Sequence, residues 1–122
     1  MKKFINGFGY AFKGIVLATK TQLNFRVHLI AMLITIVVAS LLKISGNEWL
    51  WIILCFALVL AAELFNTAIE ILTDLVSPNF HEKAGAVKDL AAGAVLITAI
   101  FALITGCIIL LPKIFALIFY AT

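Results

Sequence analysis

Three long apolar runs limit this chain to a small set of folds. The runs cover about residues 24–43, 49–75 and 89–111, and roughly 20 apolar residues are enough for a helix to cross ~30 Å of hydrocarbon. Within a bilayer every backbone N–H and C=O must bond inside the protein, so such runs form helices. With 65% hydrophobic and only 12% charged residues, the chain departs strongly from soluble domains. We therefore expect an all-α membrane protein, with residues 1–122 forming a single domain.

A further helix is expected ahead of the first span, at about residues 3–21. Its apolar side chains recur at helical spacing, while lysines interrupt the run and prevent it from spanning. The apolar stripe consists of Phe4, Phe8, Phe12 and Ile15. A basic amphipathic helix with aromatic anchors lies in the plane of the membrane interface, where it either only anchors the chain or also takes part in binding. This stretch lacks the pattern of a cleavable signal peptide.

Polar segments separate the spans and indicate their orientation. A turn at 43–48 follows the first span, Ser77-Pro78-Asn79 is expected to stop the second before a loop at 77–89, and Pro112 is expected to end the third. The apolar tail after Pro112 could either prolong the third helix or lie at the interface. Seven of the nine basic residues fall on the side of the N-terminus and of the 77–89 loop: Lys2, Lys3, Lys13, Lys20, Arg26, Lys83 and Lys88. Because cytoplasmic loops carry the excess of Lys and Arg, we expect a multi-pass protein of the cell membrane with this side in the cytoplasm. Topology accounts for the net charge of +3 without a nucleic-acid partner.

Polar residues inside the second apolar run mark the candidate site. Glu63, Asn66, Glu70 and Asp74 fall within one helical stripe about 80° wide, at 100° per residue. An ionisable side chain near the bilayer centre costs roughly 2.5–3.5 kcal/mol on insertion scales, so such residues are rare and usually functional. Spanning a membrane requires none of these side chains, and we therefore interpret the stripe as a functional site.

The two glutamates of this stripe are expected to lie at different depths. The second span runs inward, which places Glu63 about 10 Å deeper than Glu70. Near the headgroups, Glu70 could hold a hard cation, which prefers oxygen ligands. In the acyl region, Glu63 suits general-base work on a lipid hydroxyl. Lys88 and Asp89 are expected at the N-terminal end of the third helix, where anions are favoured; Lys88 would face phosphate, and Asp89 would orient it or cap the helix. Phosphoryl transfer needs a set of this kind.

The motifs resemble a known family. The run Glu-Leu-Phe-Asn-Thr-Ala-Ile-Glu at 63–70, then His81, then Ala-Val-Lys-Asp at 86–89 are similar to the bacterial integral-membrane diacylglycerol kinases, which include the undecaprenol kinases of Gram-positive bacteria. The resemblance covers nearly the whole chain. It implies a homotrimeric helical bundle with active sites between subunits. It also implies transfer of the γ-phosphoryl group of ATP, with Mg²⁺, to a lipid alcohol, converting diacylglycerol to phosphatidic acid for phospholipid recycling.

The resemblance also assigns roles to individual residues. Glu63 matches the catalytic base and Glu70 a metal ligand. Gln22 stands where the family usually has a second metal-binding glutamate; its amide oxygen can coordinate Mg²⁺ but brings no charge. The candidate nucleotide-, phosphate- and cofactor-binding residues are Lys3, Tyr10, Gln22, Asn66, Glu70, Asn79, His81, Lys88 and Asp89.

Several alternatives remain open at the level of the sequence. The pattern Asn24-x-Arg26-x-His28 is closer to the undecaprenol-kinase branch, whose product is undecaprenyl phosphate. By its residues alone, the segment 22–28 is either an interfacial collar or a second wall of the site that offers Gln22, Asn24 and Arg26 toward phosphate. A lone intramembrane glutamate also occurs in small cation-coupled transporters. Gln22 is further compatible with a homologue that has lost catalysis. The kinase is favoured because a transporter needs no polar cluster on the side where ATP is found.

Overall fold

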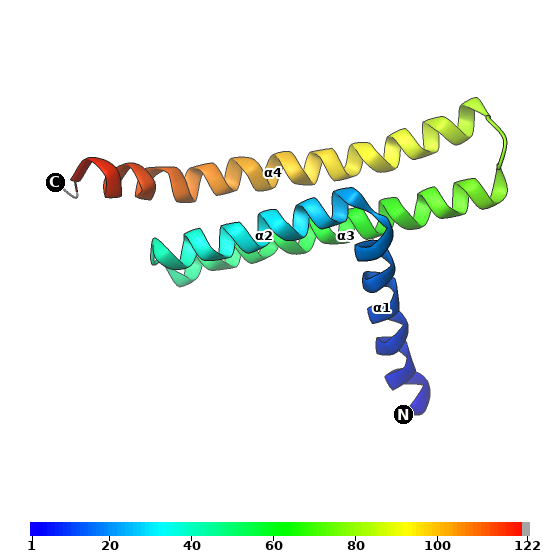
Figure 1. The fold of residues 1–122 in the computed structure, drawn as a ribbon, viewed down its shortest axis with the longest axis horizontal. Coiled ribbons are helices and arrows are strands. Elements are labelled where there is room, and N and C mark those ends of the chain that lie inside the picture. Colours follow the sequence, from blue (N-terminus) through cyan, green and yellow to red (C-terminus); the bar gives the residue numbers. More distant parts are fainter. Residues whose placement is uncertain (121–122) are drawn as a thin grey trace.

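The computed structural model describes residues 1–120, which form four α-helices. They are α1 (Lys2–Thr21), α2 (Leu23–Leu41), α3 (Gly46–Val76) and α4 (Glu82–Tyr120). The last three run lengthwise beside one another, whereas α1 projects away from them (Figure 1). α2, α3 and α4 are each long and apolar enough to cross a membrane. The predicted all-helical architecture with three such helices is therefore confirmed.

A single extended residue separates α1 from α2. Gln22 has φ −104° and ψ 117°, which interrupts the helix without a glycine or proline. Just before it, the hydroxyl of Thr19 donates to the carbonyl of Ile15 and that of Thr21 to Leu17, each at 2.8 Å. Such bonds back to the preceding turn bend helices. The polar residues that follow Gln22 then form the first turns of α2, as expected for a span extended backward from its apolar core.

The turn between α2 and α3 is shorter than the sequence suggested, because α3 begins at Gly46. The hydroxyl of Ser45 accepts a hydrogen bond from the backbone N–H of Glu48, and the Glu48 carboxylate accepts one from the N–H of Ser45. This reciprocal capping box satisfies two otherwise unpaired donors and starts the helix. Lys43 takes the left-handed conformation in the turn, with φ 50°. At its other end α3 stops at Val76, before Pro78, as predicted.

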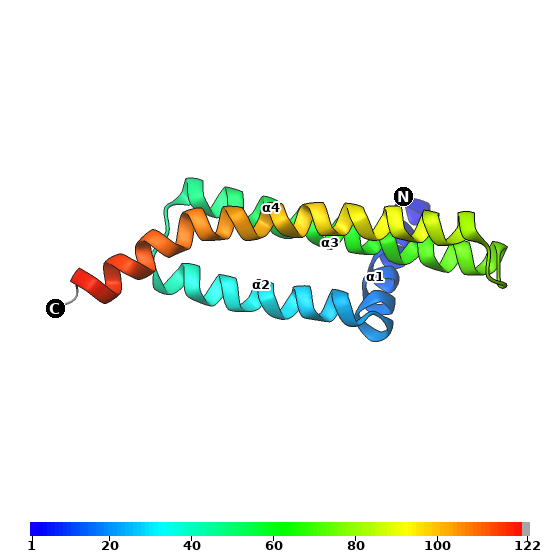
Figure 2. The ribbon, with the colours of Figure 1, turned by 90° about the horizontal axis from the view of Figure 1, so that it is seen from above.

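The prediction that Pro112 ends the last helix is wrong, and the alternative that the tail prolongs this helix is confirmed. α4 has 39 residues and continues through Pro112. A proline removes one backbone donor and crowds the preceding turn, and Figure 2 shows the last turns of α4 bending away from the line of the rest. Transmembrane helices tolerate proline where the freed backbone groups can be satisfied again. Directly after the proline, Lys113 forms an ion pair with Glu48 of α3, at 3.2 Å.

A buried apolar cluster lies at the end of the bundle near the α2–α3 turn. Ala39, Ile44, Ile52 and Ile109 form a buried cluster there, against which Trp49 and other large side chains pack. α3 and α4 stay side by side along most of their length (Figures 1 and 2). Most other large apolar side chains are exposed on the outer faces of the helices. In a membrane protein such faces meet lipid chains or other helices.

Candidate active site

The candidate base, Glu63, is buried inside the helical bundle. It is 2% exposed and comes from the middle of α3. Its Oε1 lies 3.1 Å from Nε2 of His28 on α2. A buried carboxylate without a partner would be very costly, and a hydrogen-bonding partner offsets that cost. The glutamate therefore faces protein, as is usual for ionisable residues inside a membrane.

His28 is a part of this site that the sequence did not reveal. Its position in the polar segment before the first span indicated only an interfacial collar or a wall of the site. The distance of His28 from the turn that joins the two antiparallel helices could have indicated its pairing with Glu63. His28 lies 14 residues before the turn and Glu63 lies 17 residues after α3 begins, or about 21 and 26 Å along the helix axes. Two isolated polar side chains at similar depths in adjoining helices are candidates for a pair.

Asn66 and Glu70 form the second part of the site. The Asn66 side chain donates from Nδ2 to Oε1 of Glu70 at 3.0 Å. Its own oxygen, Oδ1, is buried and has no hydrogen-bond partner among the described residues, and the hydroxyl of the neighbouring Thr67 is in the same state. Leaving a buried polar atom unpaired costs about 1–3 kcal/mol, and nearly all such atoms in proteins are paired. Two unpaired polar atoms thus lie close to the Asn66–Glu70 hydrogen bond on α3.

The length of α3 exceeds what a membrane span requires. Its 31 residues measure about 46 Å, more than the ~30 Å of hydrocarbon that a span has to cross. Counting roughly 20 residues inward from Trp49, which the sequence places at the interface, reaches Ile69. Glu63 then lies one to two turns inside the acyl region, and Glu70 lies at its boundary.

Asp74 and Lys88 lie together where α3 and α4 approach their connecting loop. The Lys88 ammonium forms an ion pair and hydrogen bond with Oδ1 of Asp74, and both side chains are substantially exposed. Asp74 thus departs from the buried part of the stripe and joins the two helices. Lys88 already has an acidic partner here, so any contact with phosphate would compete with this pair.

The prediction that Lys88 and Asp89 stand at the start of the last helix is wrong. α4 begins at Glu82, and both residues lie more than one turn inside it. His81 provides the cap, because its Nδ1 accepts a hydrogen bond from the backbone N–H of Lys83 at 3.2 Å. A side-chain acceptor immediately before a helix satisfies one of its free donors, and the acidic Glu82 in the first turn favours the same start.

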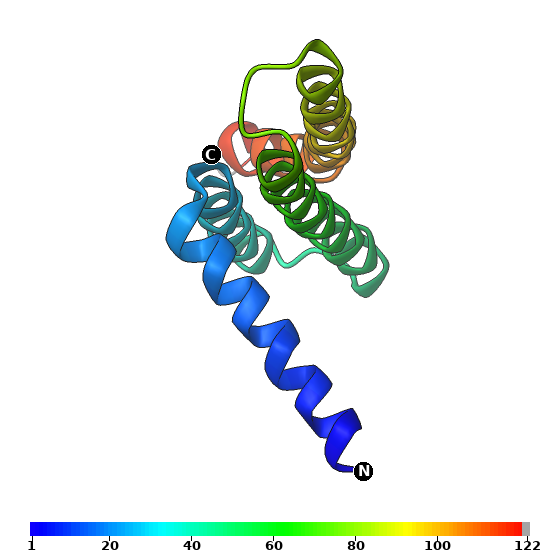
Figure 3. The same cartoon turned by 90° about the vertical axis from the view of Figure 1, so that its right-hand side faces the viewer.

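The remaining predicted site residues lie apart from the Glu63–His28 and Asn66–Glu70 pairs. Gln22 is half-buried at the α1–α2 junction, and its Nε2 donates to the Thr21 hydroxyl at 3.4 Å. Asn79 is exposed in the loop. Lys3 and Tyr10 are exposed on the part of α1 that points away from the bundle (Figure 3). A single chain thus brings together His28 with Glu63 and Asn66 with Glu70. Within residues 1–120 no group of three or more His, Cys, Asp or Glu side chains could hold a metal ion.

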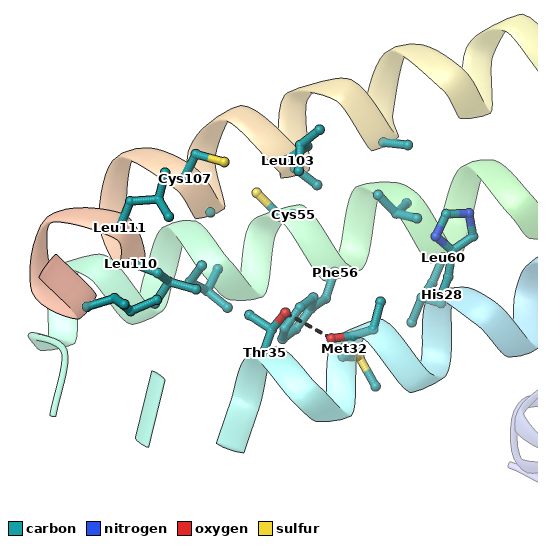
Figure 4. Close-up of a pocket in the computed structure, with 17 residues that line it drawn as sticks. His28, Met32, Thr35, Cys55, Phe56, Leu60, Leu103, Cys107, Leu110 and Leu111 are labelled. Atoms are coloured by element: carbon teal, nitrogen blue, oxygen red, sulfur yellow. Dashed lines mark hydrogen bonds between the residues drawn. The ribbon is translucent and has the colours of Figure 1, made fainter. Parts of the chain in front are cut away.

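An apolar cavity of about 420 Å³ lies between α2, α3 and α4. His28 stands at one end of it, and the polar hydroxyl of Thr35 is further along α2 (Figure 4). The other walls are aliphatic or aromatic, or carry the sulfur atoms of Met32, Cys55 and Cys107. Such walls suit a hydrocarbon chain and do not suit a nucleotide. A second hollow, of about 320 Å³, lies between the C-terminal half of α1 and residues 64–71 of α3, and Thr67 lines it.

Residues 9–110 match the family model of the prokaryotic diacylglycerol kinases. The chain belongs to this family. It is 37% identical over 113 residues to the undecaprenol kinase of Bacillus subtilis (strain 168), covering 93% of this chain and 92% of that protein. It is 35% identical to the diacylglycerol kinase of Escherichia coli (strain K12), covering 88% of each. It is also 43% identical to the diacylglycerol kinase of a Synechocystis species, covering 90% of this chain but only 63% of that longer protein. Family membership confirms the resemblance drawn from the 63–70 run.

Proposed function

We propose that this protein is a lipid kinase that uses ATP and Mg²⁺ to phosphorylate a membrane lipid alcohol, with diacylglycerol as the acceptor and phosphatidic acid as the product. The observation that carries this proposal is the family match across residues 9–110. The matched region includes Glu63, a carboxylate buried within a long apolar helix. A soluble substrate would not need its base at that depth, whereas a lipid hydroxyl resides near it.

Glu63 is the proposed general base. Its carboxylate takes the proton of the lipid hydroxyl as the hydroxyl oxygen forms a bond to the γ-phosphorus of ATP. The bond between that phosphorus and the bridging oxygen breaks, and ADP leaves with the electron pair. The protein contributes chiefly by positioning the two reactants and by stabilising the charge that they share.

Glu70 and Gln22 are the proposed ligands of Mg²⁺, which would neutralise phosphate charge and orient the phosphates. The donor chemistry supports this assignment, because Glu70 offers a carboxylate and the buried Oδ1 of Asn66 beside it has no partner in the described part of the chain. Hard cations prefer such oxygen donors. The proposed nucleotide contacts come from the family resemblance and are Lys3, Tyr10, Asn79, His81, Lys88 and Asp89.

We further propose that three copies assemble, with α1 on the cytoplasmic membrane surface. In one chain Lys3 and Tyr10 belong to the N-terminal half of α1, which projects away from the other helices (Figure 3). An active site formed between subunits would let them reach the site of a neighbour. The apolar stripe and lysines of α1, together with its direction away from the bundle, support its placement at the interface.

Undecaprenol is the second candidate acceptor. The observation that favours it is the relative from Bacillus subtilis named undecaprenol kinase, whose length the chain covers almost completely. Both acceptors present a hydroxyl at the membrane surface attached to hydrocarbon. The same base and the same metal ligands would serve either reaction.

The deciding experiment supplies labelled ATP to the purified protein in mixed micelles, with diacylglycerol and undecaprenol in parallel and with or without Mg²⁺. We expect Mg²⁺-dependent label in diacylglycerol; label confined to undecaprenol would select the second acceptor.

Glu63→Gln should lower turnover by at least about 100-fold while leaving the oligomer intact. The matched control is Glu48→Gln, which changes a carboxylate at the opposite end of α3. Turnover retained in Glu63→Gln would refute the base, and no label in either lipid from a folded oligomer would refute the kinase.

A further inference from the structure

We propose that His28 is a positioning residue for Glu63, a role that rests on the proposed kinase function. Its Nε2 lies 3.1 Å from Oε1 of the glutamate. An N–H at that nitrogen would donate to the carboxylate and hold one of its oxygens. The second oxygen, Oε2, is then free to meet the lipid hydroxyl.

The pair joins two different helices at a buried point. The Glu63 side chain is 3% exposed and the His28 side chain is 24% exposed. Among residues 1–120, His28 is the residue whose side chain contacts the Glu63 carboxylate. The amide of Asn66, one turn along α3, donates instead to Glu70. The nearby Arg26 of α2 is exposed. The orientation of the base is therefore fixed from α2 and not from its own helix.

A carboxylate needs such a partner because its last torsion is soft. The terminal torsion of a glutamate has a broad, roughly two-fold profile, so α3 alone leaves the plane of the carboxylate poorly defined. A hydrogen bond to a charged acceptor is stronger than a neutral one and selects one orientation in advance of the reaction. His28 also lines the end of the apolar cavity (Figure 4), so its ring contacts both that cavity and the base.

The test compares two substitutions of His28 in the full-length protein. His28→Leu keeps an apolar side chain of similar size but has no donor, whereas His28→Gln retains an N–H donor. We expect His28→Leu to lower kcat by about 10- to 100-fold, the size of effect of a hydrogen bond to a charged group. The KM for Mg-ATP should stay within about twofold, since the contacts of His28 are with Glu63 and with the apolar cavity, and His28→Gln should recover most of kcat.

Two controls separate positioning from a general structural role. Ser40→Ala removes a polar side chain from the same helix, about 18 Å from His28, and should leave kcat unchanged. In a Glu63→Gln background, His28→Leu should cause no further loss of kcat, because His28 acts through the Glu63 carboxylate and that carboxylate is absent. Wild-type kcat in His28→Leu, or equal losses in His28→Leu and His28→Gln together with a lower thermal midpoint, would overturn the proposal. An inactive wild-type protein would instead refute the kinase function itself.

Discussion

Gln22 combines two roles at the residue scale, since it ends α1 and is a proposed ligand of Mg²⁺. Its backbone is extended and its side chain is half-buried at the junction of α1 and α2. An amide oxygen can coordinate a hard cation but contributes no negative charge, and ligand charge is one determinant of cation affinity. We predict that Gln22→Glu lowers the Mg²⁺ concentration for half-maximal activity by about tenfold. Activity measured across a magnesium titration checks this.

The comparison needs two further variants. Gln22→Leu removes the oxygen and should raise the half-maximal Mg²⁺ concentration, while Glu48→Gln at the other end of the bundle should leave it unchanged. If all four proteins respond equally to Mg²⁺, Gln22 is not a ligand and the metal site lies elsewhere.

The residues of the site differ in how far the sequence could reveal them. The stripe of Glu63, Asn66 and Glu70 was predictable because helical spacing within an apolar run places them on one face. The partner of Glu63 was not, because the pair with His28 depends on how α2 packs on α3, and no local pattern encodes that packing. The two unpaired oxygens beside Glu70 depend on burial and were equally hidden from the sequence.

The start of α3 is a prediction at the scale of an element. Ser45 and Glu48 form the capping box there, and replacing a capping serine by alanine costs about 1 kcal/mol of helix or protein stability. We predict that Ser45→Ala lowers the thermal midpoint of inactivation in detergent by a few degrees. Activity at low temperature should not change, because the cap lies about 27 Å along α3 from Glu63.

A second serine provides the control for the cap. Ser40 is exposed on α2 and its side chain forms no cap, so Ser40→Ala should leave the midpoint within experimental error. Equal midpoints in Ser45→Ala and the wild type would show that the capping box does not stabilise the protein.

Helix existence was predictable from the sequence, whereas several helix ends were not. Apolar length required three spanning helices, and Pro78 correctly marked where α3 stops. Pro112 removes one backbone donor but only bends α4 (Figure 2), because the helical hydrogen bonds resume after it. α4 begins at Glu82, earlier than predicted, because the ring of His81 supplies a capping acceptor. Histidine rarely takes this role.

At the scale of the whole molecule, the structure divides into two chemically different ends. One end holds the capping box, the Lys113–Glu48 ion pair and the buried apolar cluster. The other holds the candidate site, the Asp74–Lys88 pair and the helix α1. Closing the bundle at one end leaves the polar end free to bind reactants.

The same division leads to a prediction about orientation. Seven of the nine basic residues belong to α1, to the start of α2 and to the region from the α3–α4 loop to Lys88. By the positive-inside rule we expect the end of the bundle that carries these residues to face the cytoplasm. We predict that a cysteine at Phe80, which is 97% exposed in the loop, reacts with a membrane-impermeant maleimide only after the cells are opened. A cysteine at Asn47, exposed at the start of α3, should react in intact spheroplasts.

This labelling needs a background in which Cys55 and Cys107 are replaced by alanine, and that background should label on neither side. Each single-cysteine protein must also retain kinase activity, so that the labelled molecules are folded and inserted. Labelling of Phe80→Cys in intact spheroplasts would place the α3–α4 loop outside the cell. The proposed catalytic base, Glu63, would then face away from the ATP supply, and the lipid-kinase proposal would fail together with the orientation.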